Sequence, residues 1–160
     1  MLTVAASLII VLGLMTSLAR YIRGRSAGTA TKRMLVQLDG LIREHHRATG
    51  ELPMVPPLIA DAASSLDEET LQKAAAANSR ALAASLSRQL ERSDAGIAPR
   101  ADATLRDAWG TPIVYMAPGA PNILTSPQSR FFLISAGPDR SFLTRVDNLY
   151  SYEEAAGQRE

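Results

Sequence analysis

The sequence predicts an α+β fold in which a long N-terminal helix packs on a small C-terminal antiparallel sheet, with an additional alanine-rich helix between them. Three observations predict it: an uncharged apolar run that continues into an amphipathic segment, an alanine-rich stretch with helical periodicity, and a C-terminal region rich in aromatic and β-branched residues. We find no internal repeat, so a single domain follows the apolar run.

Residues 1–19 are expected to form a membrane-spanning helix. The run LTVAASLIIVLGLMTSLA, residues 2–19, contains no charged side chain. It approaches the length that crosses the hydrocarbon core, about 20 residues at about 1.5 Å rise each. The alternatives are a cleaved signal peptide and a buried soluble helix. We favour a retained single-pass helix, because no basic residue precedes the run and arginines follow it in place of a small-residue cleavage site.

The charges that flank this run bear on its orientation. Arg20, Arg23 and Arg25 follow it directly. The positive-inside tendency would keep this flank, and the domain beyond it, in the cytoplasm.

Composition excludes several other functions. The formal net charge is +1, and the chain is locally basic only between Arg20 and Arg33. A nucleic-acid surface would need a basic stripe on the domain, so no nucleic-acid partner is expected. Next to a membrane helix, this basic segment favours contact with lipid headgroups. The chain has no cysteine, which excludes disulfides and thiolate metal sites.

Residues 20–50 are expected to continue the helix with an amphipathic face. Side chains recur at helical spacing on one stripe, with Leu35 and Ile42 beside it: Met34, Leu38, Leu41 and His45. Gly50 stands where a C-terminal cap is expected, and Pro53 prevents the helix from resuming.

Residues 51–106 are expected to hold a proline-rich loop and the alanine-rich helix. Ser65 with Glu68 three residues later fits a capping box, which would start the helix at Ser65. Its apolar stripe runs from Leu71 to Leu90, and the helix should end between Ser93 and Gly96. The stripe is narrow, so the helix should lie on the domain as a decoration; the alternative is a face for a partner.

Residues 107–152 are expected to form the sheet, followed by a tail over residues 153–160. Thr111–Met116 and Arg130–Ser135 are rich in residues that favour strands, and Ser141–Thr144 is a shorter third candidate. Ala136–Asp139 (AGPD) predicts the turn between the last two.

No catalytic constellation is present. His45 and His46 are adjacent, so they point about 100° apart on a helix and do not readily share a metal ion. The sequence lacks G-x-S-x-G, P-loop and H-E-x-x-H motifs. We therefore expect no enzyme activity and no small-molecule substrate.

Three segments resemble the type IV pilin class, and in particular the major pseudopilin of type II secretion. They are Leu38–Leu41 through the T-G-E-L-P turn ending at Pro53, the D-x-W-G-x-P-x-x-Y motif from Asp107 to Tyr115, and the S-x-G-x-D turn from Ser135 to Asp139, followed by Asp147 and Asn148. Their order and approximate spacing agree with the family over most of the chain, apart from the alanine-rich helix.

The resemblance implies a noncatalytic, membrane-anchored filament subunit. Its partners would be the membrane and other copies of itself or related subunits. Its location would be the bacterial inner membrane, with the domain on the periplasmic side. The alternative is a single-pass, membrane-tethered binding module that faces the cytoplasm.

The motif residues carry specific expectations. Asp107 should accept backbone N–H bonds in the turn, Gly110 should permit that turn, and Trp109 should be an anchor between sheet and helix or simply fill the core. The family also binds calcium after its S-x-G-x-D turn, which nominates Asp139 and Asp147 as ligands; the alternative is a solvated turn.

The chain differs from the family pattern at its N-terminus. The family carries a basic leader before the apolar run and a glutamate near the start of the mature helix. Ala5 or Ala6 occupies the corresponding place in this chain. Two explanations stay open: either the biological start differs from the start of this sequence, or the chain is an atypical or minor subunit.

Overall fold

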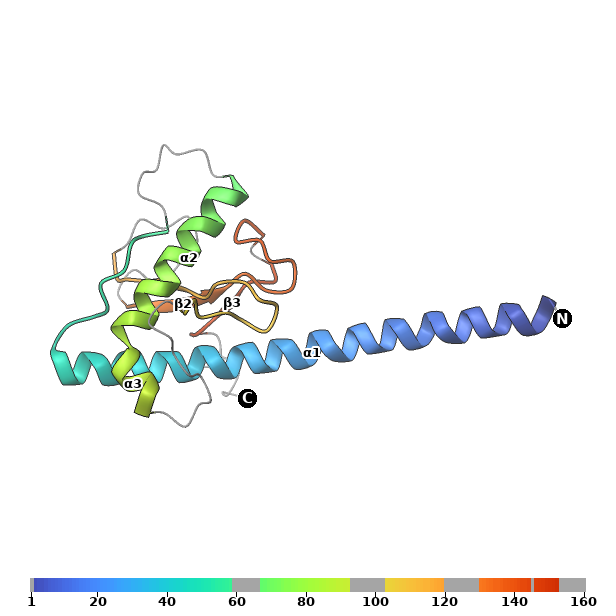
Figure 1. The fold of residues 1–160 in the computed structure, drawn as a ribbon, viewed down its shortest axis with the longest axis horizontal. Coiled ribbons are helices and arrows are strands. Elements are labelled where there is room, and N and C mark those ends of the chain that lie inside the picture. The colour runs from blue at the N-terminus through green and yellow to red at the C-terminus, as the bar shows by residue number, and fades with distance from the viewer. Residues whose placement is uncertain (1, 59–66, 93–102, 120–129, 145, 153–160) are drawn as a thin grey trace.

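The fold is α+β, as predicted (Figure 1). The computed structural model describes residues 2–58, 67–92, 103–119, 130–144 and 146–152, with side chains except at residues 2–23, 25 and 90–92. The elements in chain order are α1 (Leu2–Thr49), α2 (Glu68–Ser85), α3 (Ser87–Arg92), β1 (Val114–Met116), β2 (Phe132–Ser135) and β3 (Leu149–Tyr150). The predicted tail, residues 153–160, lies outside the described residues.

Helix α1 is continuous, and its N-terminal part projects beyond the domain that packs on its C-terminal part (Figure 1). It ends where predicted, because Gly50 adopts φ +77° and its N–H donates to His46 O at 2.8 Å. Among the residues whose side chains are described, no helix is long and apolar enough to cross a membrane. The side chains of the predicted membrane segment, residues 1–19, lie outside that set.

The buried stripe of α1 is centred slightly away from the predicted one. Leu35, Leu38 and Ile42 are almost completely buried, whereas Met34, Leu41 and His45 are half-buried. Thr31 continues the stripe one turn earlier and is also fully buried. The helix therefore packs along a line at spacings of three and four residues from Thr31 to Ile42.

The sheet is antiparallel with strand order β1-β2-β3. Tyr115 pairs with Leu133, and Ser135 pairs with Leu149. The first two strands lie inside their predicted ranges, but the prediction of a third strand at Ser141–Thr144 is wrong. That segment is a loop whose Phe142 is buried, and its polar groups bond to side chains instead of to a neighbouring strand.

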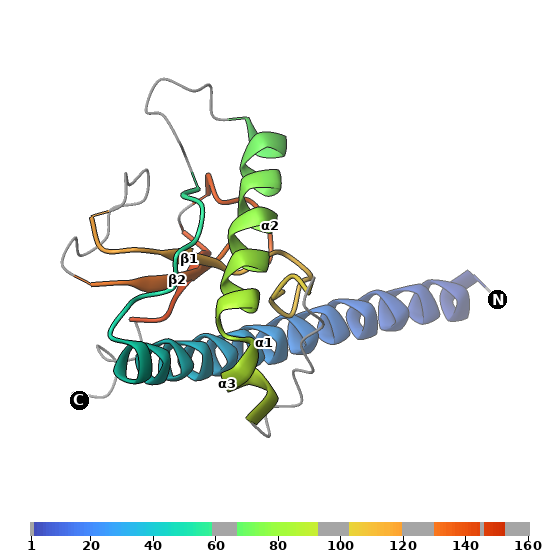
Figure 2. The ribbon, with the colours of Figure 1, turned by 60° about the vertical axis from the view of Figure 1, so that its left-hand side comes forward.

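Both faces of the sheet are buried, which the sequence did not predict. Tyr115 and Leu133 belong to the cluster that includes the buried stripe of α1. The alternate residues, Val114, Met116, Phe132 and Ile134, pack with Leu71 and Ala75 of α2. Figure 2 shows α2 crossing α1 beside β1 and β2. The alanine-rich helix α2 therefore covers the second face of the sheet and contributes to the core, whereas it was predicted to be a decoration.

The boundaries of α2 differ from the prediction. The N-cap is Asp67, since its two carboxylate oxygens accept from Thr70 N and Thr70 Oγ1, each at 2.7 Å. The hydrogen bond from the Thr70 side chain is the main cause that lowers the pKa of Asp67. The predicted cap, Ser65, lies outside the described residues.

The helical stretch is also interrupted, where a single helix to Ser93–Gly96 was predicted. Helix α2 ends at Ser85, whose Oγ donates back to Ala81 O at 2.9 Å, a bond that bends helices. Leu86 is fully buried at this break, and α3 follows to Arg92. The break between α2 and α3 therefore lies at a side chain that is packed in the core.

Candidate functional site

The D-x-W-G turn is organised around the buried carboxylate of Asp107, which is 6% exposed. Its Oδ1 accepts the N–H groups of Trp109 at 3.0 Å and Thr111 at 2.8 Å, which is the capping role expected from the sequence. Its Oδ2 accepts the hydroxyl of Ser135 at 2.6 Å. One carboxylate thus closes the turn and fastens it to β2. Gly110 adopts φ +86°, as such a turn requires.

The same turn is attached to α1 at the point where the helix leaves the domain. The N–H of Ala108 donates to Thr31 Oγ1 at 3.1 Å. The half-buried Trp109 ring reaches to 4.0 Å from the position that a Cβ on Gly28 would occupy. The Trp109 ring therefore lies beside α1 at Gly28, which agrees with the expected position between sheet and helix. Sequence reasoning missed Thr31; its place four residues before Leu35 on the buried stripe was the available signal.

Tyr115, the last residue of the motif, is held by a side chain of α2. Asn78 Oδ1 accepts the Tyr115 N–H at 2.8 Å, and Asn78 Nδ2 donates to Tyr115 O at 2.9 Å and to Pro56 O at 2.8 Å. The Asn78 amide thus bonds to both backbone groups of Tyr115 on the edge of β1 that faces away from β2, as a neighbouring strand would. Burial raises the pKa of Tyr115 to about 12, so its hydroxyl stays protonated at neutral pH.

Asn78 and Ser79 were also missed by sequence reasoning. Both are fully buried, and Ser79 Oγ donates to Leu105 O at 2.8 Å. Two polar residues inside the apolar stripe between Ala75 and Leu82 were the available signal, since buried polar groups need partners.

The S-x-G-x-D turn brings β2 close to the chain that enters β3. Gly137 adopts φ +72°, and its N–H donates to Ser135 Oγ at 3.2 Å. A Cβ on Gly137 would lie 2.2 Å from Asp147 O, closer than side-chain carbons approach backbone oxygens. The glycine is therefore required by the close approach of two backbone segments.

In the loop between β2 and β3, described over residues 136–144 and 146–148, the side chain of Asn148 is 4% exposed and contacts several backbone groups. Its amide nitrogen, turned toward the loop, donates to the carbonyl oxygens of Ala136, Ser141 and Thr144 at 3.2, 3.3 and 3.2 Å. We assign this orientation because the opposite one sets an oxygen against three acceptors.

Helix α2 holds the same loop from outside. Ser141 Oγ donates to Glu68 Oε2 at 2.8 Å, and Gln72 Nε2 donates to Arg140 O at 2.7 Å. Arg140 adopts φ +64°, and its side chain is exposed. The loop is thus fixed at both its centre and its outer side.

The two predicted calcium ligands lie in this loop, and one hydrogen bond joins the backbone of Asp139 to the carboxylate of Asp147. Asp147 Oδ2 accepts the Asp139 N–H at 3.3 Å, and Asp139 Oδ1 accepts the Ser141 N–H at 2.9 Å. Asp147 Oδ1 is buried with no hydrogen-bond partner among the described groups. Calcium takes about six to eight oxygen ligands. In the described part of the chain, no three His, Cys, Asp or Glu side chains gather to hold a metal ion. These residues do not complete a calcium site, and calcium binding stays a prediction.

The remaining candidates are placed separately. His45 is half-buried with Nδ1 3.4 Å from Gln89 Nε2, while His46 is exposed. Pro53 is buried, three residues after Gly50.

In the part of the chain that the structure describes, the candidate site therefore consists of two turns: the D-x-W-G turn joins β2 to α1, and the S-x-G-x-D turn leads into the loop that α2 holds. Comparison with protein-family models, with curated proteins and with solved structures finds no match for this chain.

Proposed function

We propose that this chain is a noncatalytic, membrane-anchored structural subunit of a pilin-like filament, of the type II secretion pseudopilin kind. The observation that carries the proposal is the single unbroken helix from Leu2 to Thr49, whose C-terminal part packs in the domain while its N-terminal part projects (Figure 1). The projecting part includes the uncharged sequence of residues 2–19. The D-x-W-G turn and its attachment to this helix support the same reading.

The domain is fastened to α1 so that the two would move together. Thr31 bonds to the turn, Leu35 to Ile42 form the buried stripe, and Gly50 starts the return of the chain toward the sheet. A helix that packs with its copies would therefore carry the domain to a defined place on the filament surface. In the membrane, the same helix would store the subunit before assembly.

Close packing of such helices is favoured by small residues. Ala5, Ala6, Ser7 and Gly13 occur within the apolar run. Small side chains let helix backbones approach closely, and van der Waals contacts then drive association in lipid. The partners would be other copies or related pilin-like subunits.

Cysteine cross-linking in whole cells, where stored and assembled subunits are both sampled, tests this packing. The chain has no cysteine, so pairs of single-cysteine variants can be co-expressed, with substitutions placed one at a time along residues 4–17. We expect cross-links between different positions at a constant offset, because a filament is built from staggered, head-to-tail contacts. Met54→Cys, a 91% exposed position beyond the end of α1, is the control and should not cross-link.

Two other patterns would contradict the proposal. Cross-links only between identical positions would indicate a closed two-fold dimer. The absence of any cross-link would favour a monomeric tether.

The competing function is a membrane-tethered binding module that faces the cytoplasm. Arg20, Arg23 and Arg25 favour it, because basic residues on the C-terminal flank tend to stay in the cytoplasm. The side of the membrane on which the domain lies separates the two functions.

A further inference from the structure

The loop between β2 and β3 exposes aliphatic side chains and the side chain of an arginine. Val146 is 97% exposed and Leu143 is 47% exposed, and the Arg140 side chain nearby is also exposed. Phe142, by contrast, is buried and belongs to the core. The loop thus buries Phe142 in the core and leaves Leu143 and Val146 exposed to solvent.

These side chains are displayed by a loop that is well fixed. Asn148 bonds to three carbonyl oxygens inside it, Glu68 and Gln72 hold it from α2, and Gly137 packs against the backbone of Asp147. Little conformational entropy would be lost if a surface bound to its outer side. The exposure of Val146 is therefore a property of the folded loop.

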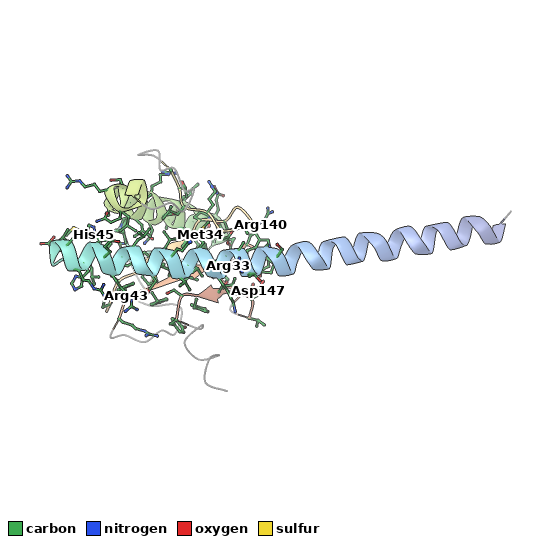
Figure 3. The ribbon with its side chains drawn as sticks, turned by 90° about the horizontal axis from the view of Figure 1, so that it is seen from below. Arg33, Met34, Arg43, His45, Arg140 and Asp147 are labelled. Carbon is green, nitrogen blue, oxygen red and sulfur yellow. The ribbon has the colours of Figure 1, made fainter. Side chains whose placement is uncertain are left out.

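The loop lies at the end of the domain from which α1 projects. Figure 3 shows Arg140 and Asp147 at that end, and His45 at the opposite end. Trp109 marks the level at which the domain meets the helix, near Gly28. Gly28 is nine residues after Ala19, which corresponds to about 13 Å along the helix axis. If α1 tilts in the membrane by a typical angle of about 20° toward the loop, the distance between the loop and the bilayer becomes shorter than this.

The α1 segment that leads from this end toward the apolar run is basic in sequence. The sequence between residues 20 and 33 contains five basic residues and no acidic one: Arg20, Arg23, Arg25, Lys32 and Arg33. The loop itself carries Asp139 and Asp147 as well as Arg140: one oxygen of each carboxylate accepts a backbone N–H, and the side chains of Asp139 and Arg140 are both exposed. Cations beside exposed aliphatic groups are the combination that binds anionic lipid interfaces.

We propose that the β2–β3 loop is a second membrane contact, in which Leu143 and Val146 enter the headgroup region of an anionic bilayer and Arg140 binds lipid phosphates. This inference rests on the proposed anchoring of α1 in the membrane. Its consequence is that the domain stands in one orientation on the membrane before any filament forms.

Site-directed spin labelling of the full chain tests the contact. Single cysteines are introduced at Val146 and, as a matched control of similar exposure at the other end of the domain, at Met54. A third label at Leu8 reports on the apolar run. Each protein is placed as a single copy in nanodiscs of phosphatidylcholine, with or without phosphatidylglycerol, and collisions with oxygen and with a water-soluble nickel complex are measured.

We expect the label at Val146 to lose most of its collisions with nickel and to gain collisions with oxygen in the anionic discs. The label at Met54 should remain fully accessible to nickel in both lipids. Arg140→Gln, which keeps the backbone bond from Gln72, should reduce the difference between the two lipids at Val146.

Each contrary outcome is distinct. A Val146 label as accessible as the Met54 label, together with a Leu8 label in hydrocarbon, overturns the loop contact and leaves the anchoring of α1 intact. A Leu8 label in water overturns the anchoring and the loop contact together. Shielding of Val146 that requires two copies per disc assigns this surface to a second subunit and overturns the lipid contact.

Discussion

Gly137→Ala should destabilise the domain by about 3 kcal/mol or more, because two penalties act at one position. The residue sits at φ +72°, and its new Cβ would lie 2.2 Å from Asp147 O and 2.9 Å from Asp147 C. Relief requires the backbone of Asp147 to move, which would disturb the bonds of Asn148 next to it.

The matched control is Gly119→Ala. Gly119 has the same φ of +72°, but its Cβ would meet nothing within 4 Å. We expect a loss of only about 1 kcal/mol there, from backbone conformation alone. Urea unfolding of the full chain in detergent, followed by the fluorescence of the single tryptophan, measures both. Equal losses of unfolding free energy in the two variants would show that the close approach of Asp147 to Gly137 does not add to the cost of the substitution.

Asp107→Ala should cost about 3 kcal/mol or more, since three donors lose their acceptor in the core. These donors are Trp109 N, Thr111 N and Ser135 Oγ. The loss would loosen the turn from β2, and with it the contact of Ala108 with Thr31 on α1.

Asp107→Asn is the informative companion. Its amide oxygen can still accept the Trp109 and Thr111 N–H groups, while its nitrogen can donate to Ser135 Oγ. We therefore expect a loss of about 1 kcal/mol, from exchanging charge-assisted for neutral bonds. Hydrogen exchange at Trp109 and Thr111 should rise sharply in Asp107→Ala and little in Asp107→Asn. Comparable exchange in both variants would show that Asp107 is dispensable for the turn.

The features predicted correctly from the sequence are those set by local chemistry. Gly50 ends α1 because a residue in the left-handed conformation closes the helix. Asp107 accepts N–H groups from residues only two and four positions later in the chain. The strands around Tyr115 and Leu133 are short runs of β-branched and aromatic residues, which a local window detects.

The features missed are those that depend on partners far along the chain. Residues 141–144 have the composition of a strand, but Glu68 and Asn148 satisfy their polar groups, and β3 forms at Leu149–Tyr150 instead. The burial of Asn78 makes sense only once α2 lies against the edge of β1. The alanine-rich helix was therefore predicted as a decoration although its inner face belongs to the core.

The candidate calcium ligands illustrate the same limit. The sequence placed Asp139 and Asp147 on either side of a candidate strand, whereas the structure has both in one loop, where the Asp139 N–H donates to Asp147 Oδ2. Whether further oxygen ligands are available depends on Asn148, whose amide already bonds to three carbonyl oxygens of the loop. No spacing rule reveals that arrangement.

The central claim is that the domain lies outside the cytoplasm on a membrane-spanning α1. Protease access in intact spheroplasts, with the mature N-terminus of the same sample read by mass spectrometry, tests it most directly. The account predicts that external protease digests the domain, and a trimmed, methylated N-terminus would strengthen the assignment to the pilin-like class. Protection of the domain in intact spheroplasts, with digestion only after lysis, would place it in the cytoplasm and contradict the account.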